Sequence, residues 1–224
     1  MTVGTGCTTV SPDAATSRSA AALLPDQAGK TLPPRPPLLS PAVRKVVDNA
    51  VVQTRTTLIY DPAYVSIPYP GGDIPSERGV CADVIVRAYR AAGQDLQKIV
   101  HEDMRANFSA YPKQWGLRRP DPNIDHRRVA NLMTYFKRRG QSLPTRKKPS
   151  DYLPGDVVAW RLPGGRLHIG LVSDQRDPET ENPMVIHNIG AGTQKEDILF
   201  AWTMIGHYRS FGGGRSAPAN DRRR

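Results

Sequence analysis

The chain has 224 residues, of which 38% are hydrophobic, so it can bury one sizeable core but hardly two full domains. Its 31 Lys and Arg outnumber 21 Asp and Glu, and the net charge of +10 suits either an anionic partner or simply a basic, soluble surface. The basic runs, such as Lys137-Arg138-Arg139, have no interleaved aromatic residues, so we expect no nucleic-acid partner. No apolar stretch has the length of a membrane span, which argues against an integral membrane segment.

The two ends of the chain have compositions typical of segments without a packed core. Residues 1–39 are rich in Ala, Ser, Thr and Pro and are predicted to be a disordered leader or linker. Residues 211–224 are predicted to be a disordered basic tail. Cys7 lies among small residues that loosely resemble a lipoprotein cleavage site, but the basic start and apolar segment that should precede one are absent. Residues 40–210 are therefore expected to form a single domain.

Helical periodicity dominates the first half of this domain. Ser40-Pro41 is typical of a helix start, as N-cap and first helical position. Asn123 or Asp125 is expected to cap the last helix, which Gly140 ends. Between the first two helices lies a loop rich in Pro and Gly with room for one short strand. Apolar residues at helical spacing predict helices over 41–57, 81–92 and 99–108 and around 129–136.

The second half changes to short runs typical of strands. Pro, Gly and Asp turns separate these runs, which favours hairpins and antiparallel pairing. Strands are predicted over residues 156–160, 167–172, 183–188 and 204–209. Helices followed by an antiparallel sheet indicate an α+β fold, with the N-terminal helices packed on a small sheet.

Cys81 is the strongest candidate for a functional residue. It begins a predicted helix behind a loop rich in Gly and Pro, where unpaired backbone N–H groups and the helix dipole favour a thiolate. A thiolate is the nucleophilic form of cysteine. The alternative to a reactive cysteine is a structural one that packs as a small, buried, apolar side chain.

Two of the predicted strands, 167–172 and 183–188, carry the candidate histidines His168 and His187. A single cysteine with distant histidines is typical of cysteine hydrolases, in which an imidazole keeps the thiol ionised and protonates the leaving amine. Side chains alternate along a strand, so only one of His187 and Asn188 can face His168. Each histidine alone could equally be a hydrogen-bonded structural residue.

Several segments resemble known families. Pro154-Gly155-Asp156, the strand around His168, and Val185-Ile186-His187-Asn188 are similar to the sheet of the NlpC-like, papain-related cell-wall cysteine peptidases. More narrowly, the chain from about 41 to 210 resembles a bacterial family catalogued as domain of unknown function 1287. The segments that carry this second resemblance are Arg78 to Val84, His101 to Met104, Asn123 to Val129 and Ile186 to Gly190.

The resemblance implies a role for each matching residue. Cys81 would be the nucleophile, His168 the general base and acid, and His187 the residue that orients His168. Tyr69, which precedes paired glycines, would line the site, as would Asn188. The fold would be papain-like, the substrate a peptidoglycan peptide, the location periplasmic or secreted, and the protein a monomer without a cofactor.

The nucleophile segment departs from the peptidase pattern. Those peptidases have Asp-Cys-Ser-Gly-Phe, whereas this chain has Val80-Cys81-Ala82-Asp83-Val84. Asp83 in the first turn helps the helix dipole but would raise the pKa of the thiol, unless it meets a cation such as Arg78 or a substrate amine. This difference from the peptidase pattern affects the expected substrate and not the assignment of Cys81 as nucleophile.

Three other functions are compatible with the sequence. A metal-dependent hydrolase would use the acidic and histidine residues of two helical segments, although no His-Glu-x-x-His spacing is present. The other two are a cell-wall binding module of the same fold without activity and a papain-like lipid acyltransferase. The candidate metal ligands are His101, Asp103, Asp125 and His126.

Overall fold

The computed structural model describes residues 39–114 and 116–211. The predicted leader over 1–39 and the predicted tail over 211–224 lie almost wholly outside the described residues, as does Cys7. None of the helices within the described ranges has both the length and the apolar character needed to cross a membrane.

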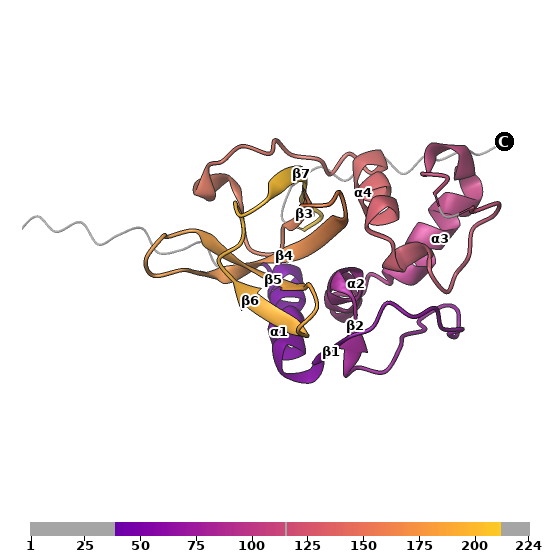
Figure 1. The fold of residues 1–224 in the computed structure, drawn as a ribbon, viewed down its shortest axis with the longest axis horizontal. Helices are drawn as coiled ribbons and strands as arrows, with labels where there is room; N and C mark the ends of the chain where they lie inside the picture. The colour runs from indigo at the N-terminus through magenta and orange to yellow at the C-terminus, as the bar shows by residue number, and fades with distance from the viewer. Residues whose placement is uncertain (1–38, 115, 212–224) are drawn as a thin grey trace, which may run out of the picture. The chain divides into compact units, whose positions relative to one another are not determined.

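Four α-helices and three short 3-10 helices form the helical part of the fold (Figure 1). The first helix begins as predicted, because the Ser40 hydroxyl accepts a hydrogen bond from the Val43 N–H at 3.3 Å and Pro41 occupies the first helical position. The α-helices are α1 (Pro41–Thr56), α2 (Cys81–Ala91), α3 (Leu96–Ala106) and α4 (Val129–Arg138). The 3-10 helices are η1 (Phe108–Ala110), η2 (Asp125–Arg127) and η3 (Pro149–Asp151).

Two helix starts differ from the sequence prediction. α3 begins three residues early, because the Asp95 carboxylate accepts the Gln97 N–H and caps it. Neither Asn123 nor Asp125 caps α4, which begins after Arg128 without a side-chain cap. The Asn123 amide oxygen accepts the Ile67 N–H instead, and the Asp125 carboxylate is bound by His101 and by the Asp121 N–H. These longer-range partners leave neither side chain available as a cap.

A five-stranded antiparallel sheet in the order β6-β5-β4-β3-β7 forms the second half of the domain. The four predicted strands are present, and the polar strand β6 was missed because its sequence has no apolar alternation. A separate parallel pair, β1 (Ile59–Tyr60) with β2 (Arg78–Gly79), lies in the loop before α2. The strands of the sheet are β3 (Val157–Arg161), β4 (Leu167–Arg176), β5 (Pro183–Asn188), β6 (Thr193–Glu196) and β7 (Thr203–Tyr208).

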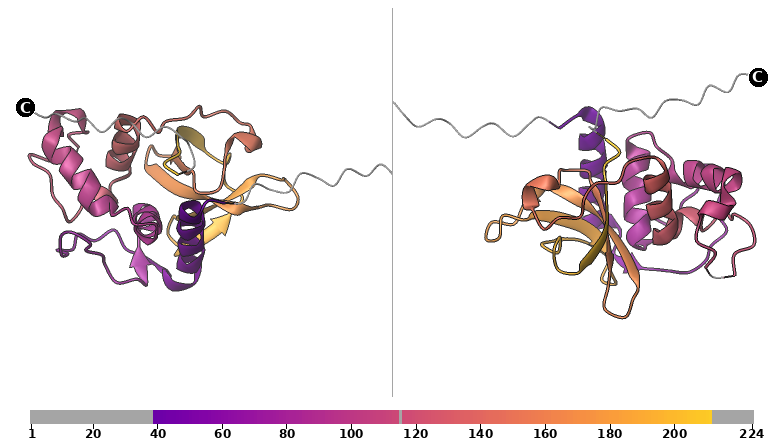
Figure 2. Two further views of the ribbon diagram at one scale, coloured as in Figure 1. Left: turned by 180° about the vertical axis from the view of Figure 1, so that it is seen from behind. Right: turned by 90° about the horizontal axis from the view of Figure 1, so that it is seen from above.

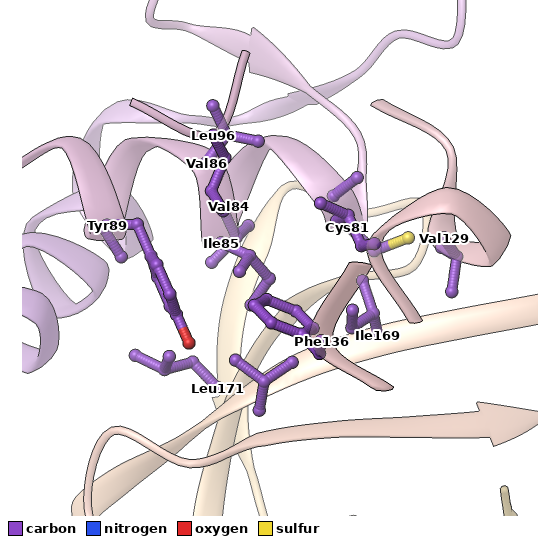
Figure 3. Packing of buried hydrophobic residues seen from close by; sticks show 14 of the residues in the cluster. Cys81, Val84, Ile85, Val86, Tyr89, Leu96, Val129, Phe136, Ile169 and Leu171 are labelled. Carbon is purple, nitrogen blue, oxygen red and sulfur yellow. The ribbon is translucent and has the colours of Figure 1, made fainter. Parts of the chain in front are cut away.

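The sheet separates two hydrophobic clusters. The α-helices lie on one side of it, which Figure 2 shows most clearly from above. On that side Ile169 and Leu171 of β4 pack with Cys81 and its helix (Figure 3). On the other side Trp160 and Val172 belong to a smaller cluster. Because side chains alternate along a strand, each residue of β4 belongs to one cluster only. The α+β class is therefore confirmed.

We predict that Gly170→Ala destabilises the fold. An added Cβ would lie 2.6 Å from Val185 Cγ1 and 3.2 Å from the Trp160 ring, so packed side chains would have to move. Overpacking of this kind costs about 1–3 kcal/mol. Denaturant unfolding measures the loss, and Gln175→Ala, at an exposed position of the same strand, is the control. Equal stability of the two variants would contradict the packing described for Gly170.

Candidate functional site around Cys81

Cys81 is the first residue of α2, and its side chain lies at the border between core and pocket. The residue is 6% exposed and belongs to the helix-side cluster, where Figure 3 shows its sulfur turned toward Val129. It also lines a pocket of about 720 Å³ together with Val80, Val129 and Leu167. The thiol therefore has contact with a cavity although most of its surface is covered.

The surroundings of the Cys81 sulfur affect the pKa of the thiol in opposite directions. Burial raises the pKa of the Cys81 thiol to about 12, and the negative charge of Asp83 acts in the same direction. The backbone N–H groups of Ile169, Ala82 and Cys81 itself act in the opposite direction and lower the pKa of the sulfur. Because burial dominates, Cys81 is a neutral thiol at neutral pH in this state.

His168 and His187 form a hydrogen-bonded pair on the other side of the sheet. His168 Nε2 lies 2.8 Å from His187 Nδ1, and His187 Nε2 lies 2.7 Å from Glu196 Oε2. The His168 ring also stacks on Trp160, with ring centroids 5.7 Å apart. The structure thus brings the two histidines together.

The pKa values of both imidazoles are shifted downward. Burial, together with a smaller effect of the neighbouring His187, lowers the pKa of His168 to about 3. Burial also lowers the pKa of His187, against the raising effect of Glu196. With both rings neutral, the Glu196 carboxylate accepts from His187 Nε2, so that His187 Nδ1 must accept from His168 Nε2. The two rings and the carboxylate therefore form one directed chain of hydrogen bonds.

The structure does not bring Cys81 and His168 together, in contrast to the predicted catalytic pair. Ile169 packs beside Cys81, and the adjacent His168 must point to the opposite face because side chains alternate along β4. None of the residues that line the Cys81 pocket is a histidine. Thiol and imidazoles are thus separated by the sheet.

Asn188 and Tyr69 also lie elsewhere than the resemblance implied. Asn188 faces the helix side, opposite to His187, and its amide donates to the Gly79 carbonyl at 3.0 Å, so it anchors the segment before Cys81. Tyr69 packs its ring edge-on against His101, with centroids 5.1 Å apart. Neither side chain lines the Cys81 pocket.

Asp83 does meet a cation, but the cation is Arg127 and not Arg78. Arg127 Nε and Nη2 lie 2.9 and 3.0 Å from the two carboxylate oxygens of Asp83, and both side chains are almost fully buried. Asp83 also accepts the Val80 N–H at 2.7 Å. Arg78 pairs with Asp61 near the surface. The unusual acidic residue of the nucleophile segment is therefore part of a buried ion pair.

Arginine and tyrosine side chains that were not predicted as site residues form much of the pocket wall. Arg161 and Arg166 flank the turn between β3 and β4, and neither has an ion pair or side-chain hydrogen bond within the described part of the chain. The available signal was their position on either side of the Pro163-Gly164-Gly165 turn next to the His168 strand. The wall also includes Tyr60, Tyr64, Arg127 and Arg128.

The candidate metal ligands do not form one site. His101 Nδ1 lies 2.9 Å from Asp125 Oδ2, whereas Asp103 is bound by Tyr111 and Arg138. Burial lowers the pKa of His126 to about 4. Over residues 39–114 and 116–211 no three His, Cys, Asp or Glu side chains gather as a metal site would require.

Comparison with known proteins gives a family. Residues 47–210 match the model of the family described as domain of unknown function 1287 (DUF1287), and the chain belongs to this family. It is also similar to the "Uncharacterized protein YijF" of Escherichia coli (strain K12), with 60% identity over 168 residues, which cover 74% of this chain and 80% of that protein. The resemblance to DUF1287 is therefore confirmed.

We predict that alkylation of Cys81 remains slow at neutral pH. Because burial raises the pKa of the thiol to about 12, the alkylation rate should rise about tenfold per pH unit from pH 7 to 10 without a plateau. Iodoacetamide labelling of a Cys7→Ala variant, followed by mass spectrometry, reports on Cys81 alone. His168→Gln should leave the profile unchanged. A plateau below pH 8 that His168→Gln abolishes would indicate a thiolate–imidazolium pair.

We predict that Arg127→Met destabilises the fold strongly. The substitution leaves the buried Asp83 carboxylate without its partner, which typically costs about 3–5 kcal/mol. Arg78→Met removes the same kind of charge from a pair whose arginine side chain is 53% exposed, and should cost about 1 kcal/mol or less. Urea unfolding of both variants checks the difference. Similar losses would mean that the buried pair contributes little beyond a surface contact.

Proposed function

We propose that this member of the DUF1287 family is a cysteine-dependent amide hydrolase, an amidase or endopeptidase, that acts on peptidoglycan peptides with Cys81 as nucleophile. The observation that carries the proposal is the position of the thiol. It occupies the first turn of α2, lies in the wall of a pocket, and has backbone N–H groups nearby that lower the pKa of its sulfur. Such donors stabilise a thiolate and are suited to an oxyanion.

The arrangement of the fold also supports the proposed cysteine hydrolase activity. A cysteine at a helix start, packed against an antiparallel sheet, is the layout implied by the resemblance to NlpC-like, papain-related peptidases. We therefore propose that the fold is of this type. Periplasmic or secreted localisation follows from the proposed substrate and is part of the proposal.

The charge of the pocket favours a carboxylate-bearing substrate. The Arg161 and Arg166 side chains are exposed at the pocket, and the residues that line it include no Asp or Glu. Guanidinium groups bind carboxylates through paired hydrogen bonds. Peptidoglycan peptides carry free carboxylates, and their binding here would hold a neighbouring amide bond near Cys81. Attack still requires a deprotonated sulfur, so substrate binding has to offset the effect of burial on the pKa of Cys81.

A second candidate is a module of the same fold that binds cell-wall peptides without cleaving them. The position of His168 favours it, because the imidazole lies across the sheet from the thiol. In this case the arginines of the pocket bind the ligand and Cys81 only fills the pocket wall. The two candidates share a ligand and differ in turnover.

We predict that the purified protein releases peptides or amino groups from isolated peptidoglycan and that Cys81→Ala removes this activity. The Ala side chain lacks the nucleophile and is smaller only by the sulfur atom, which borders the pocket, so the fold should be retained. Mass spectrometry of the soluble fragments identifies the bond that is cleaved, and circular dichroism checks folding. Arg44→Gln, at an exposed position of α1, is a control that should leave the rate unchanged.

The outcomes separate the candidates. Equal product release by wild type and Cys81→Ala would disprove the role of the thiol. Binding of soluble cell-wall peptides by both proteins, with no product from either, would instead support the binding module.

A further inference from the structure

A second pocket adjoins the Cys81 pocket. It has a volume of about 770 Å³, and the two share Tyr64 in their walls. α3 contributes His101 and Arg105 to the second pocket, and the loop before η2 contributes Arg118 and Arg119. We call this second pocket the His101 pocket. It has no part in the reaction proposed for Cys81.

His101 is held in one orientation at this pocket. The residue is 7% exposed, and its Nδ1 lies 2.9 Å from Oδ2 of Asp125, which is fully buried. The same carboxylate oxygen accepts the Asp121 N–H at 2.8 Å, and the Tyr69 ring packs edge-on against the imidazole. Because Asp125 Oδ2 is an acceptor, His101 Nδ1 carries the proton. No hydrogen bond to the other nitrogen, Nε2, occurs among the described residues.

Three arginines of this pocket have no partner within residues 39–114 and 116–211. Arg105, Arg118 and Arg119 are exposed and form no ion pair or side-chain hydrogen bond there. The negative groups nearby are Asp121, Asp125 and Glu102, and all three are engaged, Glu102 by Lys98 at 2.9 Å. Asp121 accepts from Tyr64 and Asn123, and Asp125 from His101. The His101 pocket therefore has an excess of positive charge. Its guanidinium groups, unlike its carboxylates, still have hydrogen-bonding capacity for a ligand.

We propose that the His101 pocket binds a phosphate group. Three guanidinium groups offer more N–H donors than the two oxygens of a carboxylate can accept, whereas a phosphate ester presents three terminal oxygens. With its proton on Nδ1, His101 presents Nε2 as an acceptor, which can take a hydrogen bond from the P–OH of a monoprotonated phosphate. The site is independent of the thiol chemistry proposed for Cys81.

The test is a titration of the full chain with inorganic phosphate at low ionic strength, followed by calorimetry. Saturable binding is expected, and Arg118→Gln with Arg119→Gln should weaken it at least tenfold. Arg44→Gln with Lys45→Gln on α1 is the matched control. It removes the same number of positive charges at exposed positions that do not line the pocket, and should change the affinity for phosphate less than twofold.

Further ligands identify the source of the phosphate group. A phosphate ester of a sugar or peptide that binds more tightly than inorganic phosphate, and through the same arginines, would show that the group belongs to a larger ligand. Tighter binding of inorganic phosphate would show the free ion to be the ligand.

Three results would overturn the proposal. One is absence of saturable phosphate binding, and another is equal weakening by the Arg118/Arg119 and Arg44/Lys45 double variants, which would reveal only general charge attraction. The third is competition by acetate as strong as that by phosphate, because the site would then be selective for no tetrahedral anion. His101→Gln is a supplementary variant, and loss of its fold would not affect the arginine comparison.

Discussion

The buried ion pair of Asp83 and Arg127 determines how the segments around Cys81 are arranged. Asp83 joins the first turn of α2 to the Val80 N–H that precedes it and to the guanidinium group of Arg127. The same guanidinium donates to the carbonyl oxygens of Asp61 and Ala63, at 3.0 and 2.8 Å. One pair of charges thereby connects the helix start, the loop before it and η2, which together border the Cys81 pocket. A buried pair in which every nitrogen and oxygen has a hydrogen-bond partner is suited to fixing geometry, even where its net contribution to stability is small.

The alternation of side chains along β4 imposes the second constraint. A single strand contributes Ile169 to the cluster around Cys81 and His168 to the cluster around Trp160. A shift of one residue in register would exchange these two side chains and would also exchange every apolar residue of the strand. The packing of Leu171 and Val172 on their respective sides therefore maintains the separation of thiol and imidazole.

Much of the fold could be predicted from the sequence, because it depends on local signals. Ser40-Pro41 and the apolar periodicity that follows define α1, and β-like runs between turns define four of five strands in the sheet. The site was less predictable, because it depends on which of several possible partners a polar side chain takes in three dimensions. Asp83 pairs with Arg127, 44 positions away in sequence, and no local pattern distinguishes that arginine from its neighbour Arg128. Facing directions also could not be predicted, since alternation shows that neighbours point apart but not which one faces the helices.

The hydrogen-bond chain from His168 through His187 reaches the surface at Glu196, whose side chain is 43% exposed. Each ring can donate from one nitrogen only while it is neutral, so the tautomer of the innermost ring is determined by the carboxylate at the outer end. A solvent-accessible group on the edge strand β6 thus sets the direction of the dipoles beneath Trp160 and Trp202. A charged group at the protein surface consequently determines the direction of the buried hydrogen bonds on this side of the sheet.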